Sequence, residues 1–369
     1  MKKRDDIPSV QASADQLKTW LEEICPPVGI EIVGAVSLPC QLPHRRQWEQ
    51  WIKSGRHGGL EYLVREHQNR VDPTLLNPWS RSILVMAHRY TAGWPRHDQA
   101  PSSGAVAPLA SPWIERVSRY ARGSDYHHVL LKSMKQVVRG LQGKIAGLEA
   151  FASTDTGPYL EREYAWLAGL GFLGHNQCLI HEKLGSGVFL GVALTNLIIE
   201  DLPNAGIPAA DALYTTTARR RRPPEMAPVN MCGSCTRCID ACPTNALDLS
   251  KGMDANLCLS SWSIEWRGGA PPESAHLQGG LLFGCDICQA VCPWNNRAEQ
   301  HSQEELPVND SYQALPGHNE LSLQDLENIS DEDFRQHFRK TPIWRCHPEG
   351  MRRNAALVRK NLIGGGNHD

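Results

Sequence analysis

The chain lacks a hydrophobic run long enough to cross a membrane. Its longest apolar stretch, residues 188–199, is shorter than the ~20 residues that a transmembrane helix needs. The basic start Met-Lys-Lys-Arg leads into mostly polar residues 5–16, without the apolar segment of ~7–15 residues that marks a signal peptide. We therefore expect a cytoplasmic protein with no membrane partner.

A charge excess and a nucleotide-binding motif are also missing. The net charge is −2, so any binding of nucleic acid must come from a local basic patch. There is no Walker sequence. Residues 169–174 match G-x-G-x-x-G in letters, but they follow an expected helix and precede an expected strand, which reverses the order of a dinucleotide site. We interpret them as a helix end with close backbone packing.

Cysteine, in contrast, is abundant, and eight of the twelve cysteines form a ferredoxin pattern. Residues 232–243 read C-x2-C-x2-C-x3-C-P, the spacing of bacterial ferredoxins with two clusters. Residues 285–293 repeat this run without its first member, and Cys258 lies between the two runs. Zinc sites favour separate C-x2-C pairs. We therefore predict two 4Fe–4S clusters and neither zinc nor disulfides.

The fourth cysteine of such a run ligates the other cluster, and this rule assigns the ligands. One cluster takes Cys232, Cys235, Cys238 and Cys292, and the other takes Cys242, Cys258, Cys285 and Cys288. Thiolate clusters agree with a reducing cytoplasm. The remaining four are isolated in sequence, and we expect small buried apolar side chains at Cys25, Cys40, Cys178 and Cys346.

The chain of 369 residues is long enough for two or three domains. A capping box at residues 13–16 opens a helix to about residue 24. Apolar spacing predicts further helices at 125–150 and 161–170, and strands at 30–36, 82–87 and 188–199, the last as one long or two short strands. This alternation favours a layered α/β or α+β domain. The expected boundaries are a catalytic domain at 1–201, a linker at 202–228, a ferredoxin-like domain at 229–296, and a helical, basic tail at 297–369.

Residues 155–162, Asp-Thr-Gly-Pro-Tyr-Leu-Glu-Arg, resemble a signature of the epoxyqueuosine reductases. The cluster run is shared with many ferredoxins, so the specific signals are this motif and residues 120–127. The supporting motifs follow in the order of the family: Arg70-Val-Asp-Pro73, Tyr120-Ala-Arg-Gly-Ser-Asp-Tyr-His127, Ala168-Gly-Leu-Gly-Phe172, Cys232-Gly-Ser-Cys-Thr-Arg-Cys238, Cys258-Leu-Ser260 and Gly284-Cys-Asp-Ile-Cys-Gln289.

The resemblance implies a cobalamin-dependent enzyme that reduces epoxyqueuosine to queuosine at the wobble position of tRNA. It implies an α+β fold with a nitroreductase-like cobalamin-binding domain, a two-cluster ferredoxin-like domain and a short helical tail. Electrons would pass from an external low-potential donor through the clusters to cobalamin, in a protein that we expect to be a monomer. No Asp-x-His-x-x-Gly stretch occurs, so we expect no axial cobalt ligand from the protein.

Opening an epoxide places charge on oxygen, so a general acid is required. The resemblance implies that Asp155 is this acid, kept protonated by a pKa that an apolar pocket raises. The alternative is that Asp155 caps the helix at 161–170. Cobalamin contacts are implied for Asp155 and for Arg70, Ser118, Asp125, His127, Arg162, Ser260 and Asp286. As an alternative, Asp125 and His127 cap the start of a helix and have no part in the site. Arg162 likewise has the alternative of a surface ion pair with Glu161.

The chain departs from the family at three places. His175 stands where the family commonly has Lys, which leaves the role of that Lys in doubt. The loop at 202–230 is long, and the sequence ends at residue 369, where many members continue into helical repeats. Two basic groups remain for the tRNA anticodon arm: the loop run Arg219–Arg222, and the tail residues Arg339, Lys340, Arg345, Arg352 and Arg353.

Two other functions fit part of this pattern. A cobalamin-dependent, dehalogenase-like reductase of small molecules would use the same cofactors, but exported members carry a twin-arginine signal that is not seen here. A non-catalytic electron carrier would leave about 200 N-terminal residues without a role. The basic tail favours the tRNA enzyme, because phosphate contacts come from Lys and Arg. A solvated helix face is the alternative for that tail.

Overall fold

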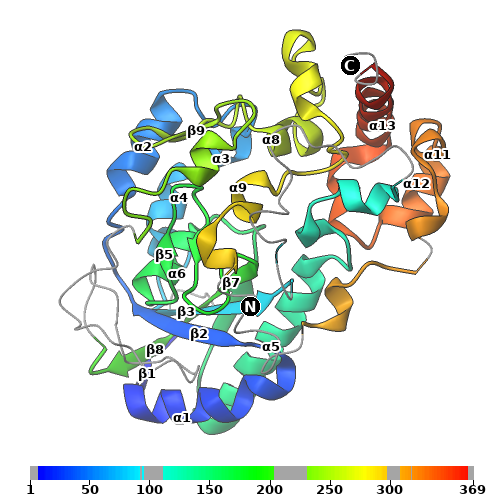
Figure 1. Cartoon of the computed structure of the whole chain (residues 1–369). Helices are drawn as coiled ribbons and strands as arrows, with labels where there is room; N and C mark the ends of the chain where they lie inside the picture. Colours follow the sequence, from blue (N-terminus) through cyan, green and yellow to red (C-terminus); the bar gives the residue numbers. More distant parts are fainter. Residues whose placement is uncertain are drawn as a thin grey trace.

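The computed structural model describes residues 7–91, 94, 111–202, 231–296, 308–316 and 318–364. A four-stranded sheet lies in the N-terminal part, and the C-terminal helices stand to one side of it (Figure 1). The expected linker at 202–228 lies outside the described residues from residue 203 onward, and so does Arg219–Arg222. No helix in the described ranges is both long and apolar enough to cross a bilayer.

The main sheet is antiparallel throughout. In spatial order its strands are β2 (Ile32–Ser37), β3 (Ser82–Arg89), β7 (Val188–Thr195) and β4 (Ala150–Ser153). All eight residues of β3 are buried, because this strand is central and helices cover both faces of the sheet. Burial on both faces explains why its sequence is a continuous apolar run rather than an alternating one.

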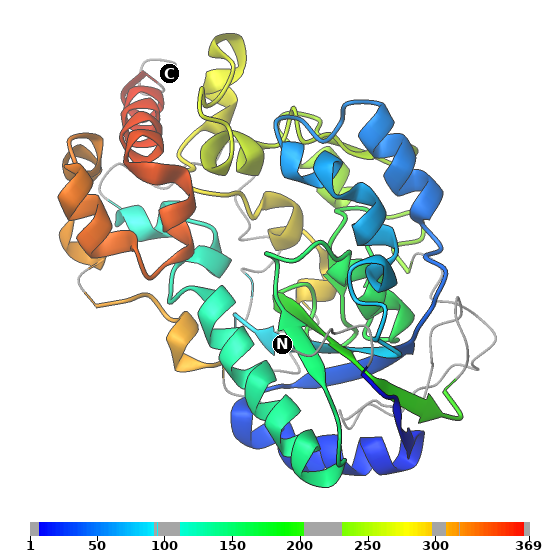
Figure 2. The same cartoon turned by 180° about the vertical axis from the view of Figure 1, so that it is seen from behind.

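Six helices of the described residues belong to this N-terminal part. They are α1 (Ala14–Ile24), α2 (Arg45–Lys53), α3 (Glu61–Arg65), α4 (His67–Val71), α5 (Tyr126–Lys144) and α6 (Glu161–Leu167). Of these, α5 and α6 contact the main sheet on opposite faces. Successive strand residues point to opposite faces. Leu84 and Met86 therefore join the core with α1 and α5, whereas Ile83 and Val85 join the core with α6. Figure 1 and Figure 2 show α1 and α5 together, away from α2, α3 and α4.

Three two-stranded sheets complete the strands among the described residues. They are the parallel pair β1 (Val10–Ser13) and β8 (Leu197–Glu200), and the antiparallel pairs β5 (Phe172–Leu173) with β6 (Leu179–Ile180) and β9 (Leu247–Asp248) with β10 (Gly252–Met253). The glycines at 169–174 end α6, with Gly169 at φ 76°. A Cβ on Gly171 would lie 2.3 Å from the carbonyl oxygen of Ile180, so the expected close backbone packing is confirmed.

The predicted elements are present, but the long helix ends earlier than predicted. The capping box of Ser13 and Gln16 forms and starts α1. The helix expected to reach residue 150 ends at Lys144, because Ile145 leaves the helical conformation and Gly147 has a φ of +80°. Residues 150–153 form strand β4 instead. The stretch at 188–199 is two strands, of which only β7 belongs to the main sheet.

The C-terminal part holds shorter helices around the cysteines and then a helical tail. The first are α7 (Arg237–Asp240), α8 (Leu259–Ile264) and α9 (Ile287–Ala290), and the tail has α11 (Leu323–Glu327), α12 (Asp331–Phe338) and α13 (His347–Gly364). Phe334, Phe338 and Met351 share a core with Trp113 and Phe283. The tail therefore packs on the segment that leads into α5 and on the chain just before Cys285.

Candidate active site and metal centres

Four of the predicted cluster ligands face a single cavity. It has a volume of about 250 Å³, and its cysteines are Cys232, Cys235, Cys238 and Cys292. Cys292 comes from the second run, so the fold brings together the set that the spacing rule assigns to one cluster. Burial raises the pKa of Cys238 to about 12. A thiol of such low acidity is deprotonated when a bound metal stabilises the thiolate, so this all-sulfur donor set fits an iron–sulfur cluster.

The other four cysteines also interact with one another. Burial raises the pKa of Cys285, and negative charge on Cys258 and Cys242 raises it further. Burial raises the pKa of Cys288 as well, with added effects from Cys178, Cys285 and Cys258. Cys178, which is isolated in sequence, therefore lies beside this set. No disulfide joins any of the cysteines, all of which fall in the described ranges.

His175 lies at the first cysteine set. Its Nδ1 is 2.9 Å from the carbonyl oxygen of Cys235, and its side chain lines the same cavity. His175 is therefore placed beside this cysteine set, and it does not hydrogen-bond to Asp155 in the structure.

Asp155 occupies a tight turn between β4 and α6. The amide of Thr156 donates to the carbonyl of Thr154 over 2.6 Å, and Asp155 between them has a φ of 56°. Such three-residue turns with positive φ are rare and strained. The amide of Asp155 donates to Glu161 Oε1 over 2.7 Å. This turn presents the Asp155 side chain to open space, with 61% of it exposed.

The alternative that Asp155 caps α6 is wrong. The residue at the cap is Leu160, and no side chain caps this helix. The contact runs the other way, because a side chain on the first turn of α6, Glu161, accepts the Asp155 amide. Glu161 therefore holds the turn. Among the described residues, Glu161 and Arg162 form no ion pair with each other, which was the alternative for these two side chains.

The start of α5 supplies the partners of Asp155. Tyr126 donates its hydroxyl to Asp155 Oδ2 over 2.6 Å. His127 places Nε2 3.4 Å from the same oxygen and Nδ1 2.6 Å from Oδ1 of Asp125. Asp125 also caps α5 by accepting the amide of His127. Both imidazole nitrogens face carboxylates, an arrangement in which both donate and the ring is positively charged.

These contacts change the pKa values of Asp155, His127 and Glu161, and the pKa of Asp155 differs from the expectation. Desolvation acts to raise the pKa of Asp155, but hydrogen bonds from His127 and Tyr126 outweigh it, so the pKa is lowered. The structure therefore shows a lowered pKa in place of the expected raised one, because two hydrogen-bond donors favour the carboxylate form. Desolvation lowers the pKa of His127, but Asp125 and Asp155 raise it to about 9. Desolvation, with the charge of Asp155, raises the pKa of Glu161 to about 8.

Ser118 and Asp286 form a second group that joins the site to the cysteines. The amide of Arg119 donates to Asp286 Oδ2 over 2.8 Å, and the amide of Ser118 donates to the carbonyl of Phe283 over 2.8 Å. Tyr120 links this group to the first, because its ring centre lies 6.2 Å from that of Tyr126. Burial raises the pKa of Tyr120, with added effects from Asp155 and Asp286.

The remaining predicted residues lie around these groups. Arg70 is buried and donates to the carbonyl of Gly157, two residues after Asp155, over 3.3 Å. Ser260 belongs to α8, and its amide lies at the sulfur of Cys258. Arg162 instead donates to the carbonyl of Gln177 and is exposed. The structure therefore brings Asp125, His127 and Asp155 into direct contact, and it does not bring Arg162 to them.

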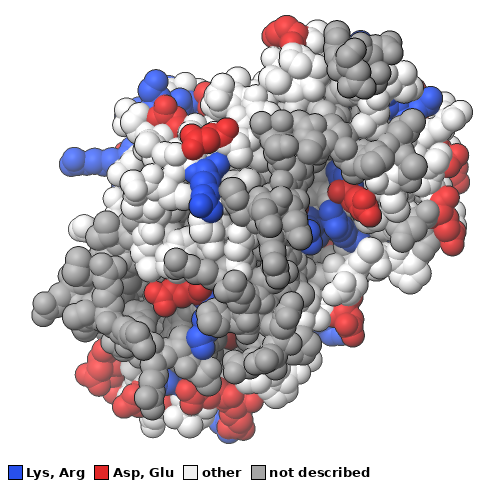
Figure 3. Space-filling model, viewed as in Figure 1, with Lys and Arg blue, Asp and Glu red and all other residues white. Residues whose placement is uncertain are grey.

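Three cations of the tail form hydrogen bonds with other residues of the chain. Arg345 donates to Glu265 from Nε and from Nη2, Arg352 donates to Asp331 over 2.8 Å, and Arg353 donates to the carbonyl of Arg267 over 2.7 Å. The tail also reaches the active site, because the amide of Asp125 donates to the carbonyl of Lys340 over 2.8 Å. Figure 3 shows Lys and Arg side chains in a hollow beside the C-terminal helices, next to Asp or Glu.

The fold and the two cysteine sets define an iron–sulfur oxidoreductase with a proton-holding site on its α+β part. Comparison with known families agrees: residues 231–295 match the model described as a 4Fe–4S double cluster binding domain, and residues 70–156 match the one described as epoxyqueuosine reductase QueG, DUF1730. The epoxyqueuosine reductase of Leadbetterella byssophila is 30% identical over 94% of this chain and 98% of its own length. That of Gloeobacter violaceus is 36% identical over 83% of each chain. The chain belongs to the epoxyqueuosine reductase family, as its motifs predicted.

Solved structures of this family have the same fold. An epoxyqueuosine reductase crystallised with an epoxyqueuosine-modified tRNA-Tyr stem loop matches with a TM-score of 0.74 and 26% identity, over 95% of this chain and 82% of its own. The Bacillus subtilis enzyme, solved with an aspartate-bearing catalytic loop swung out of its active site, also matches with a TM-score of 0.74 and 26% identity, over 96% and 84%. Both cover most of the two chains.

Proposed function

We propose that this chain reduces epoxyqueuosine to queuosine at the wobble position of tRNA. Its family membership over most of its length supports this function, and so does the fold that it shares with a relative solved on an epoxyqueuosine-modified stem loop. The observation that carries the proposal is the contact of Asp155 with a charged His127, in a chain that also has eight cysteines in two cluster sets. The reaction needs both protons and electrons, and this chain provides for both.

The two cofactors of the family are two 4Fe–4S clusters and cobalamin. The first cysteine set lines one cavity, and the thiols of the second set raise one another's pKa; both all-sulfur sets suit the clusters chemically. For cobalamin, the site offers two buried polar groups: Arg70 Nε, which lacks a hydrogen-bond partner among the described residues, and the Ser118 hydroxyl, which interacts with Asp286. Both suit the amide side chains of a corrin. We propose that Ser118, Arg70 and Asp286 hold this group beside Asp155. When bound, cobalamin supplies a strongly reducing cobalt centre.

The side chains of this chain manage the protons. Reduction of the epoxide to an alkene consumes two electrons and two protons, breaks both C–O bonds and releases water. Asp155, which its lowered pKa leaves ionised at rest, passes a proton from His127 to the epoxide oxygen through the contact between Nε2 and Oδ2. Glu161, whose pKa is about 8, holds a second proton beside the same turn. General acids of this kind contribute ~10²–10⁴-fold to rate.

The finer predictions belong to the same proposal. The N-terminal α+β part is the cobalamin-binding, nitroreductase-like domain at 1–201, followed by the ferredoxin-like domain at 229–296 and the tail at 297–369. The enzyme acts as a monomer in the cytoplasm and takes electrons from an external low-potential donor. Loss of one oxygen atom from the wobble nucleoside, measured by mass spectrometry after anaerobic incubation with modified stem-loop RNA, tests the function. A loaded, reduced enzyme that leaves epoxyqueuosine unchanged would refute it.

A further inference from the structure

The exposed face of α5 carries three cations that form no ion pair with any described residue. Helix α5, Tyr126–Lys144, contains four Lys or Arg and no Asp or Glu, although the whole chain has a net charge of −2. Lys144 pairs with Glu23 of α1. Lys132, Lys135 and Arg139 are exposed and make no ion pair with any described residue. These three are called the α5 stripe below.

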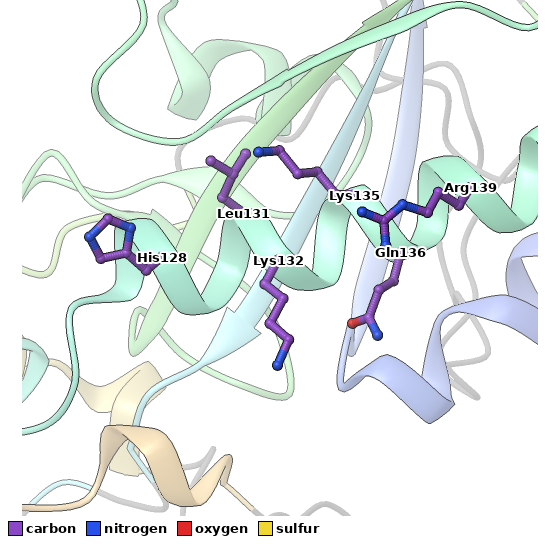
Figure 4. A pocket seen from close by; sticks show the side chains of 6 residues that line it. All are labelled: His128, Leu131, Lys132, Lys135, Gln136 and Arg139. Carbon is purple, nitrogen blue, oxygen red and sulfur yellow. The ribbon is translucent and has the colours of Figure 1, made fainter.

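The α5 stripe lines a shallow groove on a rigid support. The groove has a volume of about 290 Å³ and is lined by His128, Leu131, Lys132, Lys135, Gln136 and Arg139. Figure 4 shows their side chains along one side of the helix. The opposite face of α5 is fixed in the core through Leu130, Met134 and Val137. The cations therefore keep their spacing along the groove.

The position of the stripe relates it to the active site. α5 begins with Tyr126 and His127, which contact Asp155. At a rise of ~1.5 Å per residue, Lys132 lies ~8 Å and Arg139 ~18 Å along the axis from His127. A nucleic-acid strand has about one phosphate per ~3.4 Å of helix axis. The ~10 Å between Lys132 and Arg139 therefore matches about three phosphates next to a base held at Asp155.

We propose that the α5 stripe binds the RNA phosphate backbone beside the reacting nucleotide. This inference rests on the proposed function and adds a docking surface to it. Lys provides point charges and Arg a planar fork for phosphate oxygens, while Gln136 can donate to a phosphate or a 2′-hydroxyl. An acidic protein that delivers electrons would be expected to dock near the cysteine sets instead. The tail residues Arg345 and Arg352 are occupied by carboxylates, which makes the stripe the better phosphate site.

The test uses the full-length holoenzyme and a triple variant, Lys132→Gln, Lys135→Gln and Arg139→Gln. Glutamine keeps length and helix propensity, and circular dichroism and the melting temperature check folding. Binding of the epoxyqueuosine-modified stem loop is measured by fluorescence anisotropy over a range of salt concentrations. Each lost phosphate contact lowers the slope of log K against log salt by ~0.7–0.9. We expect a slope reduced by ~2–3 and affinity reduced on the order of 10–100-fold at low salt.

Two matched variants keep the result specific. A control that neutralises Arg46, Lys53 and Lys251 removes the same charge from exposed positions near α2 and the β9–β10 turn, away from α5 in Figure 1, and should keep the wild-type slope. Replacing Lys132 and Lys135 with Arg retains the charge and should keep it too. If the control loses as much salt slope as the triple variant, only net charge matters. If the triple variant keeps the wild-type slope, the α5 stripe does not contact the RNA. Either outcome overturns the proposal.

Turnover separates this proposal from the proposed function. With the triple variant, the loss should fall on KM for the stem loop rather than on kcat, because the stripe does not touch the reacting atoms. Wild-type turnover together with an unaltered salt slope in the triple variant would refute only the docking surface. A wild-type enzyme that binds the stem loop through the stripe but never reduces it would refute only the function.

Discussion

Replacing His127 with Gln tests the proton supply that the structure assigns to the active site. His127 lies 2.6 Å from Asp125 and 3.4 Å from Asp155, and these carboxylates raise its pKa to about 9. Gln retains a donor but has no transferable proton. A lost proton donor typically lowers rate ~10²–10⁴-fold, and we expect the lower end, ~10²-fold, at about pH 8, because Asp155 still takes protons from water.

The pH dependence gives the sharper readout. In the wild type, His127 and Glu161 hold protons below about 9 and about 8 respectively, so the rate should fall as pH rises through this range. Without His127, the pKa of Asp155 loses a lowering influence, and Asp155 binds protons more readily as the solution becomes acidic. The deficit of the variant should therefore shrink on moving from about pH 8 to about pH 6.

The assay is single-turnover reduction of modified stem-loop RNA by pre-reduced enzyme, which removes the external donor from the measured step. Replacing His276, an exposed histidine away from the described carboxylate contacts, with Gln provides the control and should keep the wild-type profile. A His127→Gln deficit of the same size at every pH would show a structural role and refute the proton-supply argument.

Three further predictions follow from the geometry. Asp155→Asn should retain iron and cobalamin but lose ~10²–10⁴-fold in turnover; near-normal turnover would remove Asp155 from the mechanism. Cys292→Ser should lower iron from about eight to about four per chain by losing the cluster of the first cysteine set, whereas Cys346→Ala should keep about eight, and equal iron in both would contradict the ligand assignment. Arg352→Ala loses hydrogen bonds to Asp331 and to a backbone carbonyl, so it should lower the free energy of unfolding by ~1 kcal/mol. The salt dependence of RNA binding should stay unchanged, and a flatter slope would show that Arg352 contacts the RNA.

The features predictable from sequence are those that local spacing determines. The cysteine runs predicted that Cys292 joins the first run, and these four cysteines line one cavity, because ferredoxin spacing fixes the path of the chain around a cluster. The capping box of Ser13 and Gln16 is likewise local. The predicted end of the helix at residue 150 was wrong because Ile145 and Leu148 continue the apolar period, although both are buried beyond the end of α5.

What sequence could not provide depends on contacts between distant segments. The pKa of Asp155 is lowered by residues almost 30 positions earlier, and the pKa of Glu161 is raised by burial and by the charge of Asp155. The tail looked free for RNA because its partners, such as Glu265 for Arg345, lie 80 residues away. The cations of the α5 stripe, in a helix without Asp or Glu, can be recognised in the sequence. Their relation to the active site could be inferred only once the structure placed His127 against Asp155.

The reduction itself is tested most directly by measuring queuosine formed per enzyme under anaerobic conditions, with both clusters loaded and with cobalamin either present or withheld. Two electrons from a chemical low-potential reductant should convert one epoxyqueuosine in the stem loop to one queuosine when cobalamin is present. Without cobalamin, the same reduced clusters and the same intact Asp155 should form none. Equal yields with and without cobalamin, or no queuosine from the fully loaded enzyme, would contradict the account.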